Sequence, residues 1–211
     1  CWKTYVGRPE TDMPRLWAMT ELGNGLQFGQ HFEEAVSVKE AVLSVLRRNG
    51  TSEANIFAVQ SNLATAYSML GRDEDALRMQ RDVYFGFLKI CGEEDLKTLQ
   101  SANNYADVLY RLLDFEEAKA LLRRTIPVAR RVVGEGDGLT LKMRWNYAET
   151  LYKDEVATLE DLSEAVTTLE ELERTARRVF GGAHPLTEGI EGELRDARAA
   201  LTARDTPSTS G

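Results

Sequence analysis

The sequence offers few side chains for acid–base, nucleophilic or metal chemistry, since its 211 residues include two histidines and two cysteines. His31 lies beside Glu33 and Glu34, and such a pair can transfer protons. The repeat described below places Arg72 and Asp114 at the position of His31 in the next two units. Because helix capping is the only role that these three residues share, we interpret His31 as structural.

The remaining candidates do not form a site either. Cys91 precedes Gly92 at the expected end of a helix, where the negative partial charge disfavours a reactive thiolate. The segment GEGDG at 134–138 lacks the Lys-Ser/Thr ending of a phosphate loop and has too few alternating carboxylates for calcium. We therefore expect no enzymatic activity, no cofactor and no metal site.

The overall charge limits the classes of partner. The chain has 26 lysines and arginines against 34 aspartates and glutamates, a formal net charge of −8. Nucleic acid and anionic membranes are therefore disfavoured, because phosphate binding needs a basic surface. The sequence also lacks a stretch of about 20 apolar residues that could insert into a bilayer.

The two cysteines, Cys1 and Cys91, are too few for a disulfide framework. This usage favours a reducing compartment and hence a cytoplasmic location. Because residue 1 is Cys rather than Met, we expect that the chain is a fragment or a processed product.

An internal repeat of about 42 residues organises the chain. Glycine, asparagine and alanine each recur at this interval, and the last interval lengthens to about 47 residues around the segment KDEVATLED. The recurring residues are Gly50, Gly92, Gly134 and Gly181; Asn62, Asn104 and Asn146; and Ala35, Ala76, Ala118 and Ala165. Because three residue types keep one register, the interval indicates a structural repeat.

Each repeat predicts two helices. The first carries apolar residues at helical spacing, as in Leu99, Ala102 and Tyr105, and the second begins with acidic and ends with basic residues. A glycine after the second helix suits a helix C-terminus. Pro127 lies within one second helix and predicts a kink there. The expected helices span 13–29, 32–48, 53–70, 73–90, 95–112, 115–132, 138–153, 159–179 and 185–203.

A helical hairpin of this size cannot cover its own apolar face, so successive hairpins must stack on a shared core. The sequence thus predicts an all-α solenoid over residues 13–203, with the repeated alanines where the two helices of a hairpin touch. Residues 1–12 match no pattern of secondary structure. Residues 204–211 are expected to be disordered because they lack an apolar anchor.

The repeats resemble tetratricopeptide repeats (TPR) of the kinesin light chain type. The similarity rests on the segments SNLATAYSMLGRDEDAL (61–77), NNYADVLYRLLDFEEAKALL (103–122) and WNYAETLYK (145–153). The loop GGAHPLTE (181–188) is also close to the family pattern G-x-x-H-P-x-T. The resemblance covers roughly residues 13–200. It implies a right-handed superhelical solenoid of about four TPR hairpins plus a C-terminal capping helix.

The resemblance also implies that the first helices line a concave groove for a peptide or a partner helix. The candidate groove residues are Asn24, Asn62, Thr65, Asn103, Asn104, Asp107, Arg111, Lys142, Trp145, Asn146, Glu149 and Lys153, with Thr20, Glu21, Ser61 and Met69 beside them. An asparagine amide can bond the backbone of any extended peptide, since it has both a donor and an acceptor. The repeated asparagines can equally fix the stacking of neighbouring hairpins, and Trp145 is either an exposed anchor or a packed side chain.

Two classes of function follow from these features. In the first, the chain is a non-catalytic adaptor or scaffold that binds a partner protein in its groove. Arg111, Lys142 and Lys153 favour a partner segment with acidic residues. In the second, the chain is the regulatory or scaffolding part of a longer protein whose upstream region is catalytic or binds zinc, with Cys1 as the last zinc ligand.

Overall fold

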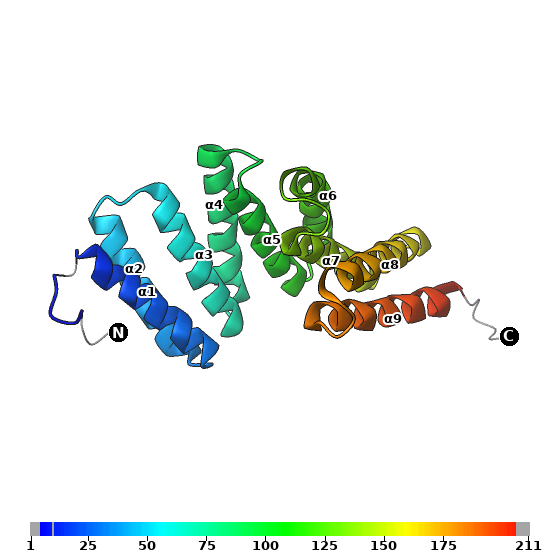
Figure 1. Cartoon of the computed structure of the whole chain (residues 1–211), viewed down its shortest axis with the longest axis horizontal. Helices are drawn as coiled ribbons and strands as arrows, with labels where there is room; N and C mark the ends of the chain where they lie inside the picture. The colour runs from blue at the N-terminus through cyan, green and yellow to red at the C-terminus, as the bar shows by residue number, and fades with distance from the viewer. Residues whose placement is uncertain (1–4, 10, 206–211) are drawn as a thin grey trace. The chain divides into compact units, whose positions relative to one another are not determined.

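The computed structural model describes residues 5–9 and 11–205, and these residues form nine α-helices and no strand (Figure 1). The helices are α1 (Met13–Phe28), α2 (Phe32–Arg48), α3 (Glu53–Met69), α4 (Asp73–Cys91), α5 (Leu96–Arg111), α6 (Phe115–Val132), α7 (Gly138–Tyr152), α8 (Leu159–Phe180) and α9 (Pro185–Asp205). Their order is that of four helical hairpins followed by a final helix. The predicted all-α fold is confirmed, with every helix within two residues of its expected ends.

Local capping interactions explain why the helices begin where the sequence indicates. The side chain of Asp114 accepts a hydrogen bond from the backbone N–H of Glu117 at the start of α6. Thr158 and Asp161 form a reciprocal capping box at the start of α8. These two helix starts are therefore fixed by residues within four positions of each other in the sequence.

The repeated glycines end the second helices as predicted. Gly50, Gly92, Gly134 and Gly181 all have positive φ angles, between 62° and 99°. This left-handed backbone conformation is disfavoured for residues with a Cβ atom, which explains why the repeat retains glycine there.

The C-terminal helix extends two residues beyond its expected end, to Asp205. The guanidinium group of Arg204 donates hydrogen bonds to the carbonyl oxygens of Ala157, at 3.0 Å, and Glu155, at 3.2 Å. These bonds tie the last turn of α9 to the loop before α8. The rest of the predicted disordered tail, residues 206–211, lies outside the described residues, as do residues 1–4 of the unassigned N-terminal segment.

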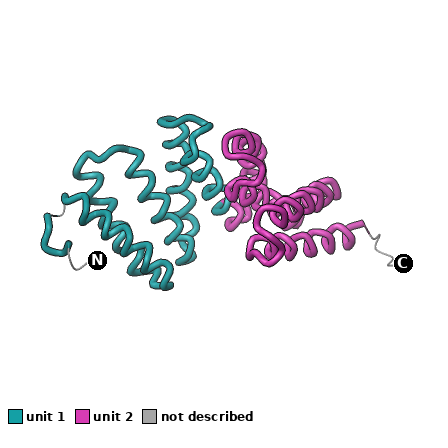
Figure 2. The backbone as a smooth tube through the Cα atoms, in the orientation of Figure 1, with its two compact units in different colours: residues 1–108 teal, residues 109–211 magenta. Residues whose placement is uncertain are grey.

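The chain divides into two compact units, residues 1–108 and residues 109–211, and the boundary falls within α5 (Figure 2). In the first unit, α1 packs on α2, α2 on α3, and α3 on α4. Leu16 of α1 packs with Val42, Val45 and Leu46 of α2, and Val59 of α3 covers the edge of this cluster. The core of the first unit is therefore shared between consecutive hairpins.

The second unit repeats this arrangement. Here α6 packs on α7, α7 on α8 and α8 on α9, and α9 also contacts α7. Leu141, Leu151, Leu169 and Ile190 are fully buried within it. Pro127 lies inside α6, which continues as one helix on both sides of it, and the predicted kink stays a prediction.

The repeated alanines occupy fully buried positions. Ala35, Ala76, Ala118 and Ala165 all have an exposed fraction of 0 %. Each lies within the first two turns of a second helix. A methyl group suits a place where two helix backbones approach closely, because a larger side chain would push them apart.

We expect the substitution Ala118→Leu to lower the free energy of unfolding by about 1–3 kcal/mol, because three extra carbon atoms would overpack a close helix crossing. Thermal melts can measure this loss. The matched control is Ala120→Leu, two residues along the same helix at an exposed position, which should change the free energy by less than about 0.5 kcal/mol. Equal melting temperatures for the two variants would contradict the placement of Ala118.

Candidate functional site

In the first unit, the first helices of two hairpins, α1 and α3, line two adjacent grooves. The Trp17 groove is lined by Met13, Leu16, Trp17, Thr20, Glu21, Val42, Leu46, Asn55, Ala58, Val59 and Asn62. The Lys39 groove is lined by Asn24, Gln27, Phe28, Gln30, Phe32, Lys39, Asn62, Thr65 and Met69. Six residues that the resemblance assigned to the concave face therefore meet here: Thr20, Glu21, Asn24, Asn62, Thr65 and Met69. Asn62 lines both grooves.

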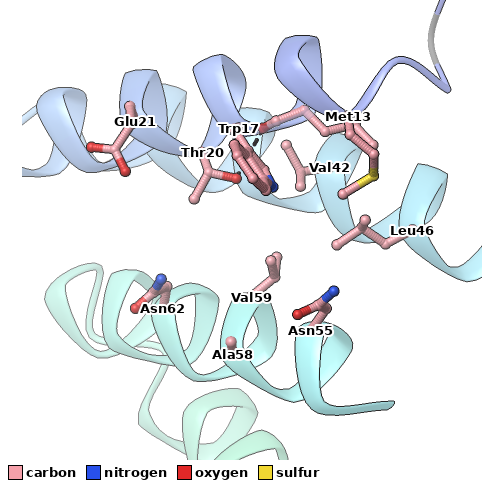
Figure 3. Close-up of a pocket in the computed structure, with 11 residues that line it drawn as sticks. Met13, Trp17, Thr20, Glu21, Val42, Leu46, Asn55, Ala58, Val59 and Asn62 are labelled. Carbon is pink, nitrogen blue, oxygen red and sulfur yellow. Dashed lines mark hydrogen bonds between the residues drawn. The ribbon is translucent and has the colours of Figure 1, made fainter. Parts of the chain in front are cut away.

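The Trp17 groove has an apolar floor and a polar rim, with an open volume of about 200 Å³. Leu16 and Val42 are buried beneath it, whereas 68 % of Trp17 is exposed. Figure 3 shows that the amides of Asn55 and Asn62 on α3 point toward α1. These two amides are available to a ligand that enters between the helices.

The Lys39 groove is wider, with an open volume of about 520 Å³. Its apolar side chains include Phe28, of which 90 % is exposed, and Met69, which is also exposed. The hydroxyl of Thr65 donates to the carbonyl oxygen of Ser61 at 3.1 Å, so its oxygen lone pairs remain as acceptors. Exposed apolar side chains beside polar groups are typical of a surface that binds another molecule.

Lys39 is the residue of this groove that sequence reasoning missed. Only 2 % of it is exposed, and its ammonium group donates to Gln27 Oε1 and, at 3.2 Å, to the carbonyl oxygen of Asn62. Its stem crosses α1 at Gly23, where a Cβ atom would lie 3.0 Å from Lys39 Cγ. Burial lowers the pKa of Lys39 to about 8.

The repeat register contains a signal that would have found Lys39. It lies four residues after Ala35, and the residues four after Ala76, Ala118 and Ala165 are Gln80, Leu122 and Leu169. These three are all buried, so the register marks position 39 as an interior site occupied by a cation.

The structure distinguishes the first two members of the asparagine series. Asn62 is exposed, whereas Asn104 is half-buried and its Nδ2 donates to Ser61 Oγ at 3.2 Å. Gln80 Nε2 donates in turn to the carbonyl oxygen of Ser61 at 3.3 Å. Asn104 and Ser61 thus belong to a polar network that joins α3, α4 and α5 within the first unit, which supports a stacking role for both.

The other predicted residues of α5 differ in exposure. Asn103 is half-buried and Asp107 is exposed, and both interact with other residues of the chain. Arg111, at the end of α5, is exposed and also engaged. None of the three lines either groove of α1 and α3.

In the second unit, the predicted residues Glu149 and Lys153 are paired with each other, and Lys153 also binds Glu193 of α9. Lys153 Nζ lies 3.2 Å from Glu149 Oε1 and 3.0 Å from Glu193 Oε2, and Tyr152 donates its hydroxyl to the same Glu193 carboxylate. Burial by itself would lower the pKa of Lys153, but the hydrogen bonds to Glu193 and Glu149 outweigh it and raise that pKa. The positive charge of Lys153 is therefore already balanced within the chain.

The remaining predicted residues of the second unit lie on α7. Lys142 is exposed, and Asn146 is half-buried and interacts with other residues of the chain. The ring of Trp145 lies against Gly189 on α9, where a Cβ atom would overlap it. No described residue accepts a hydrogen bond from the buried indole Nε1. This placement favours the packing role for Trp145 over the exposed anchor.

Two further findings bear on the classes of function. Among residues 5–9 and 11–205, no three His, Cys, Asp or Glu side chains are grouped so that they could hold a metal ion. Cys1, the suggested zinc ligand, lies outside the described residues. Within the described part of the chain, every helix is too short or too polar to cross a membrane.

The helical pairs, the repeat register and the residues on the first helices together define a helical-hairpin repeat protein. The sequence profile of the tetratricopeptide repeat family matches residues 58–84 and 98–137. These two segments are therefore similar to tetratricopeptide repeats, as the resemblance found in the sequence predicts. No curated protein matches it by sequence.

Solved structures support the same fold. A point variant of the kinesin light chain TPR-like repeats of Podosopora anserina superposes with a TM-score of 0.77 at 22 % sequence identity, covering 90 % of this chain and 88 % of that one. Another structure of these repeats gives a TM-score of 0.76 at 21 % identity, over 93 % and 90 % of the two chains. BtubC (BKLC) from P. vanneervenii gives 0.61 at 17 % identity, over 95 % and 88 %.

The asparagine contacts predict different effects on stability for two equivalent residues. Asn104→Ala should lower the free energy of unfolding by roughly 1–3 kcal/mol, because it leaves the half-buried Ser61 hydroxyl with one partner fewer. Asn62→Ala, at an exposed position, should change it by less than about 0.5 kcal/mol. Denaturant titration of the two variants beside the wild type measures both values. A loss for Asn62→Ala as large as that for Asn104→Ala would refute this distinction.

The lowered pKa of Lys39 predicts a pH-dependent gain from the substitution Lys39→Met. Below pH 8 the folded chain must hold a buried charge, so the variant should exceed the wild type in stability by roughly 1–3 kcal/mol. Between pH 8 and 10.5 the unfolded wild type binds more protons than the folded wild type. The stability of the wild type therefore rises with pH in this range, and the stability difference between the variant and the wild type becomes smaller. Denaturant titrations near the two ends of this range, at about pH 7 and about pH 10, test this.

Other titrating groups should not disturb this comparison. Burial is the only cause of the lowered pKa of Lys39. Of the nearby carboxylates, Glu21 lines the neighbouring groove, and Glu40 accepts a hydrogen bond from the Tyr67 hydroxyl at 2.6 Å. Burial and the bond to Glu40 raise the pKa of Tyr67 to about 12, which is above the pH range of the titration. Lys89→Met, at an exposed position, is the control and should give a difference that is independent of pH.

Proposed function

We propose that this protein is a non-catalytic, cytoplasmic adaptor that binds a segment of a partner protein between α1 and α3 of its first unit. Tetratricopeptide repeats are protein–protein interaction modules, and the proposal assigns this role to particular residues. The observation that carries it is the convergence of six candidate residues on the two adjacent grooves. The exposed free thiol of Cys91 is compatible with a reducing compartment.

The chemistry of the grooves fits an extended segment or a short helix. Asn24, Asn55 and Asn62 supply amides that can bond a peptide backbone in either direction. Trp17 and Phe28 supply large apolar surfaces on which a partner side chain can be buried. In a segment that makes both kinds of contact, burial on the apolar surfaces contributes affinity, and the hydrogen bonds to the amides fix the position of the segment along the groove.

The Lys39 groove, whose charged lining residue is Lys39, supports a partner segment with an acidic residue at that place, whereas the Trp17 groove contains the acidic Glu21. On the second unit, Lys142 is exposed on α7, but Lys153 is already paired with Glu149 and Glu193. The attraction of an acidic segment should therefore depend more on the first unit than on Lys153, and it should weaken with added salt.

A photo-crosslinking experiment tests the proposed site. A benzophenone amino acid replaces Thr65, which lines the Lys39 groove, or Arg81, an exposed residue of α4 outside both grooves. After irradiation in cell extract, mass spectrometry identifies the crosslinked proteins, and the strongest candidate is then purified. We expect this partner to crosslink at position 65 and not at 81, and to bind the double variant Asn24→Ala, Asn62→Ala at least tenfold more weakly than the wild type.

Two results would overturn the proposal. One is a set of crosslinked proteins that is the same for positions 65 and 81. The other is a purified partner whose affinity is unchanged by the double Asn substitution, provided that the variant has the melting temperature of the wild type.

A further inference from the structure

An Asn-Gly pair lies in the turn between α2 and α3. Asn49 is the C-cap residue of α2, and Gly50 follows it with a left-handed φ angle of 62°. Both residues are exposed, and a Cβ atom added to Gly50 would have no neighbour within 4 Å. The peptide bond between them is therefore open to solvent and unhindered on its glycine side.

The turn requires this glycine but not the asparagine before it. In the other three repeats, the residue before the equivalent glycine is Cys91, Val133 or Phe180, and the second helix still ends at or next to that residue. None of these three side chains carries a carboxamide. The carboxamide of Asn49 is therefore not needed to end the helix.

The carboxamide of Asn49 is adjacent to a nucleophile, the backbone nitrogen of Gly50. An asparagine side chain is short enough to reach the backbone next to it, and asparagine is among the thermolabile residues of proteins. Once hydroxide has removed its proton, the Gly50 nitrogen can attack Cγ of Asn49. A new C–N bond forms and the bond between Cγ and Nδ2 breaks. The Nδ2 group takes a proton from water and leaves as ammonia, and a cyclic succinimide remains.

Water then opens the succinimide at either of its carbonyl groups. Attack at Cγ leaves an aspartate at position 49. Attack at the main-chain carbonyl carbon leaves an isoaspartate, in which the chain continues through Cγ. The net reaction consumes one water and releases one ammonia, without a change of oxidation state, and either product has gained a negative charge.

A second Asn-Gly pair, Asn24-Gly25, has the same chemistry in different surroundings. It lies inside α1, where the N–H group of Gly25 belongs to the helical hydrogen-bond ladder, and Asn24 is half-buried. In the turn, the N–H group of Gly50 has a longer bond, of 3.4 Å, to the carbonyl oxygen of Arg47. Opening a helix costs more free energy than opening a turn at its end, so the fold protects Asn24 more than Asn49.

Either product would disturb the end of α2. The N–H groups of Gly50 and Thr51 close this end through the carbonyl oxygens of Arg47 and, at 3.2 Å, Leu46. An isoaspartate inserts an extra main-chain carbon before both N–H groups. The new charge meets the negative end of the helix dipole, but the basic residues of the last turn offset part of this, so the extra carbon is the larger disturbance. Leu46 and Asn55, on the two sides of the turn, lie at the same end of the Trp17 groove (Figure 3).

We propose that Asn49-Gly50 is a site of spontaneous modification, at which succinimide formation and hydrolysis convert Asn49 to isoaspartate or aspartate. The modification disrupts the hydrogen bonds that close the end of α2, beside the Trp17 groove. The reaction needs only water, so this inference does not rest on the adaptor function. It makes the turn between the first two hairpins change with the age of the molecule.

Ageing of the purified full-length chain tests this site. Wild type and Asn49→Gln, whose longer side chain closes a ring far more slowly, are incubated in warm, mildly alkaline buffer, both folded and in urea. The buffer is made with water enriched in a heavy oxygen isotope, so the oxygen taken up at ring opening labels each modified residue. Tandem mass spectrometry after proteolysis locates the label. Methyl transfer from S-adenosylmethionine by an isoaspartyl methyltransferase measures the isoaspartate.

In the folded wild type, Asn49 should be labelled about tenfold faster than Asn24 or more, because the helix must first open at Asn24. In urea, the two residues should be labelled at similar rates. The amide hydrogens of Gly50 and Thr51 should exchange with solvent faster in the aged wild type than in the fresh one. Aged Asn49→Gln should keep the exchange rates of its fresh form.

Three results would overturn the proposal. The first is labelling of Asn24 as fast as that of Asn49 in the folded chain. The second is an Asn49 that reacts in urea but stays unlabelled in the folded chain. The third is hydrogen exchange at Gly50 and Thr51 that is unchanged after Asn49 has been modified. Equal melting temperatures of fresh wild type and fresh Asn49→Gln show that the control variant is folded.

Discussion

The structure depends on the inability of a two-helix hairpin to bury its own apolar surface. In the first unit, Leu16 of α1 forms an apolar cluster with Val42 and Leu46 of the same hairpin. Val59, which belongs to the next hairpin, packs against this cluster and covers its edge. Hydrophobic burial of this kind is the main stabilising contribution to folding. Because hairpins rely on their neighbours, α3 packs on both α2 and α4, and α7 packs on both α6 and α8. In the first unit, α1 and α3 nevertheless present polar residues to the two grooves.

Much of the fold was predictable because its determinants are local and periodic. Asp114 and Thr158 cap helices through residues three positions away, and Gly92 and Gly134 end helices through their own backbone conformation. The end of α9 was placed two residues too early because it depends on Arg204, whose partners are the carbonyl groups of Ala157 and Glu155 nearly fifty residues earlier. A local sequence pattern does not predict a contact between residues that are so far apart in the chain.

The site was less predictable, because equivalent positions of a repeat share a backbone but not an environment. Asn62 and Asn104 are one period apart, yet Asn104 meets Ser61 whereas Asn62 faces a groove. Lys153 is a cation that could bind an acidic ligand, but the carboxylate of Glu193 on α9 already balances its charge. The repeat register places Lys39 at an interior position, but its residue type alone is typical of a protein surface. Its burial depends on the missing side chain of Gly23 on another helix.

Asn62 lies in the walls of both grooves, so the two grooves share one side-chain amide. Its side chain has one carbonyl oxygen and one amino group, so a ligand that accepts from the amino group in one groove fixes which atom is presented to the other. The coupling is reciprocal, since whichever groove is filled second meets an amide that the first has oriented. A continuous chain that spans both grooves would therefore be selected by the spacing between its own polar atoms as well as by the identity of its side chains. Two separate short ligands of suitable composition would compete for the same amide.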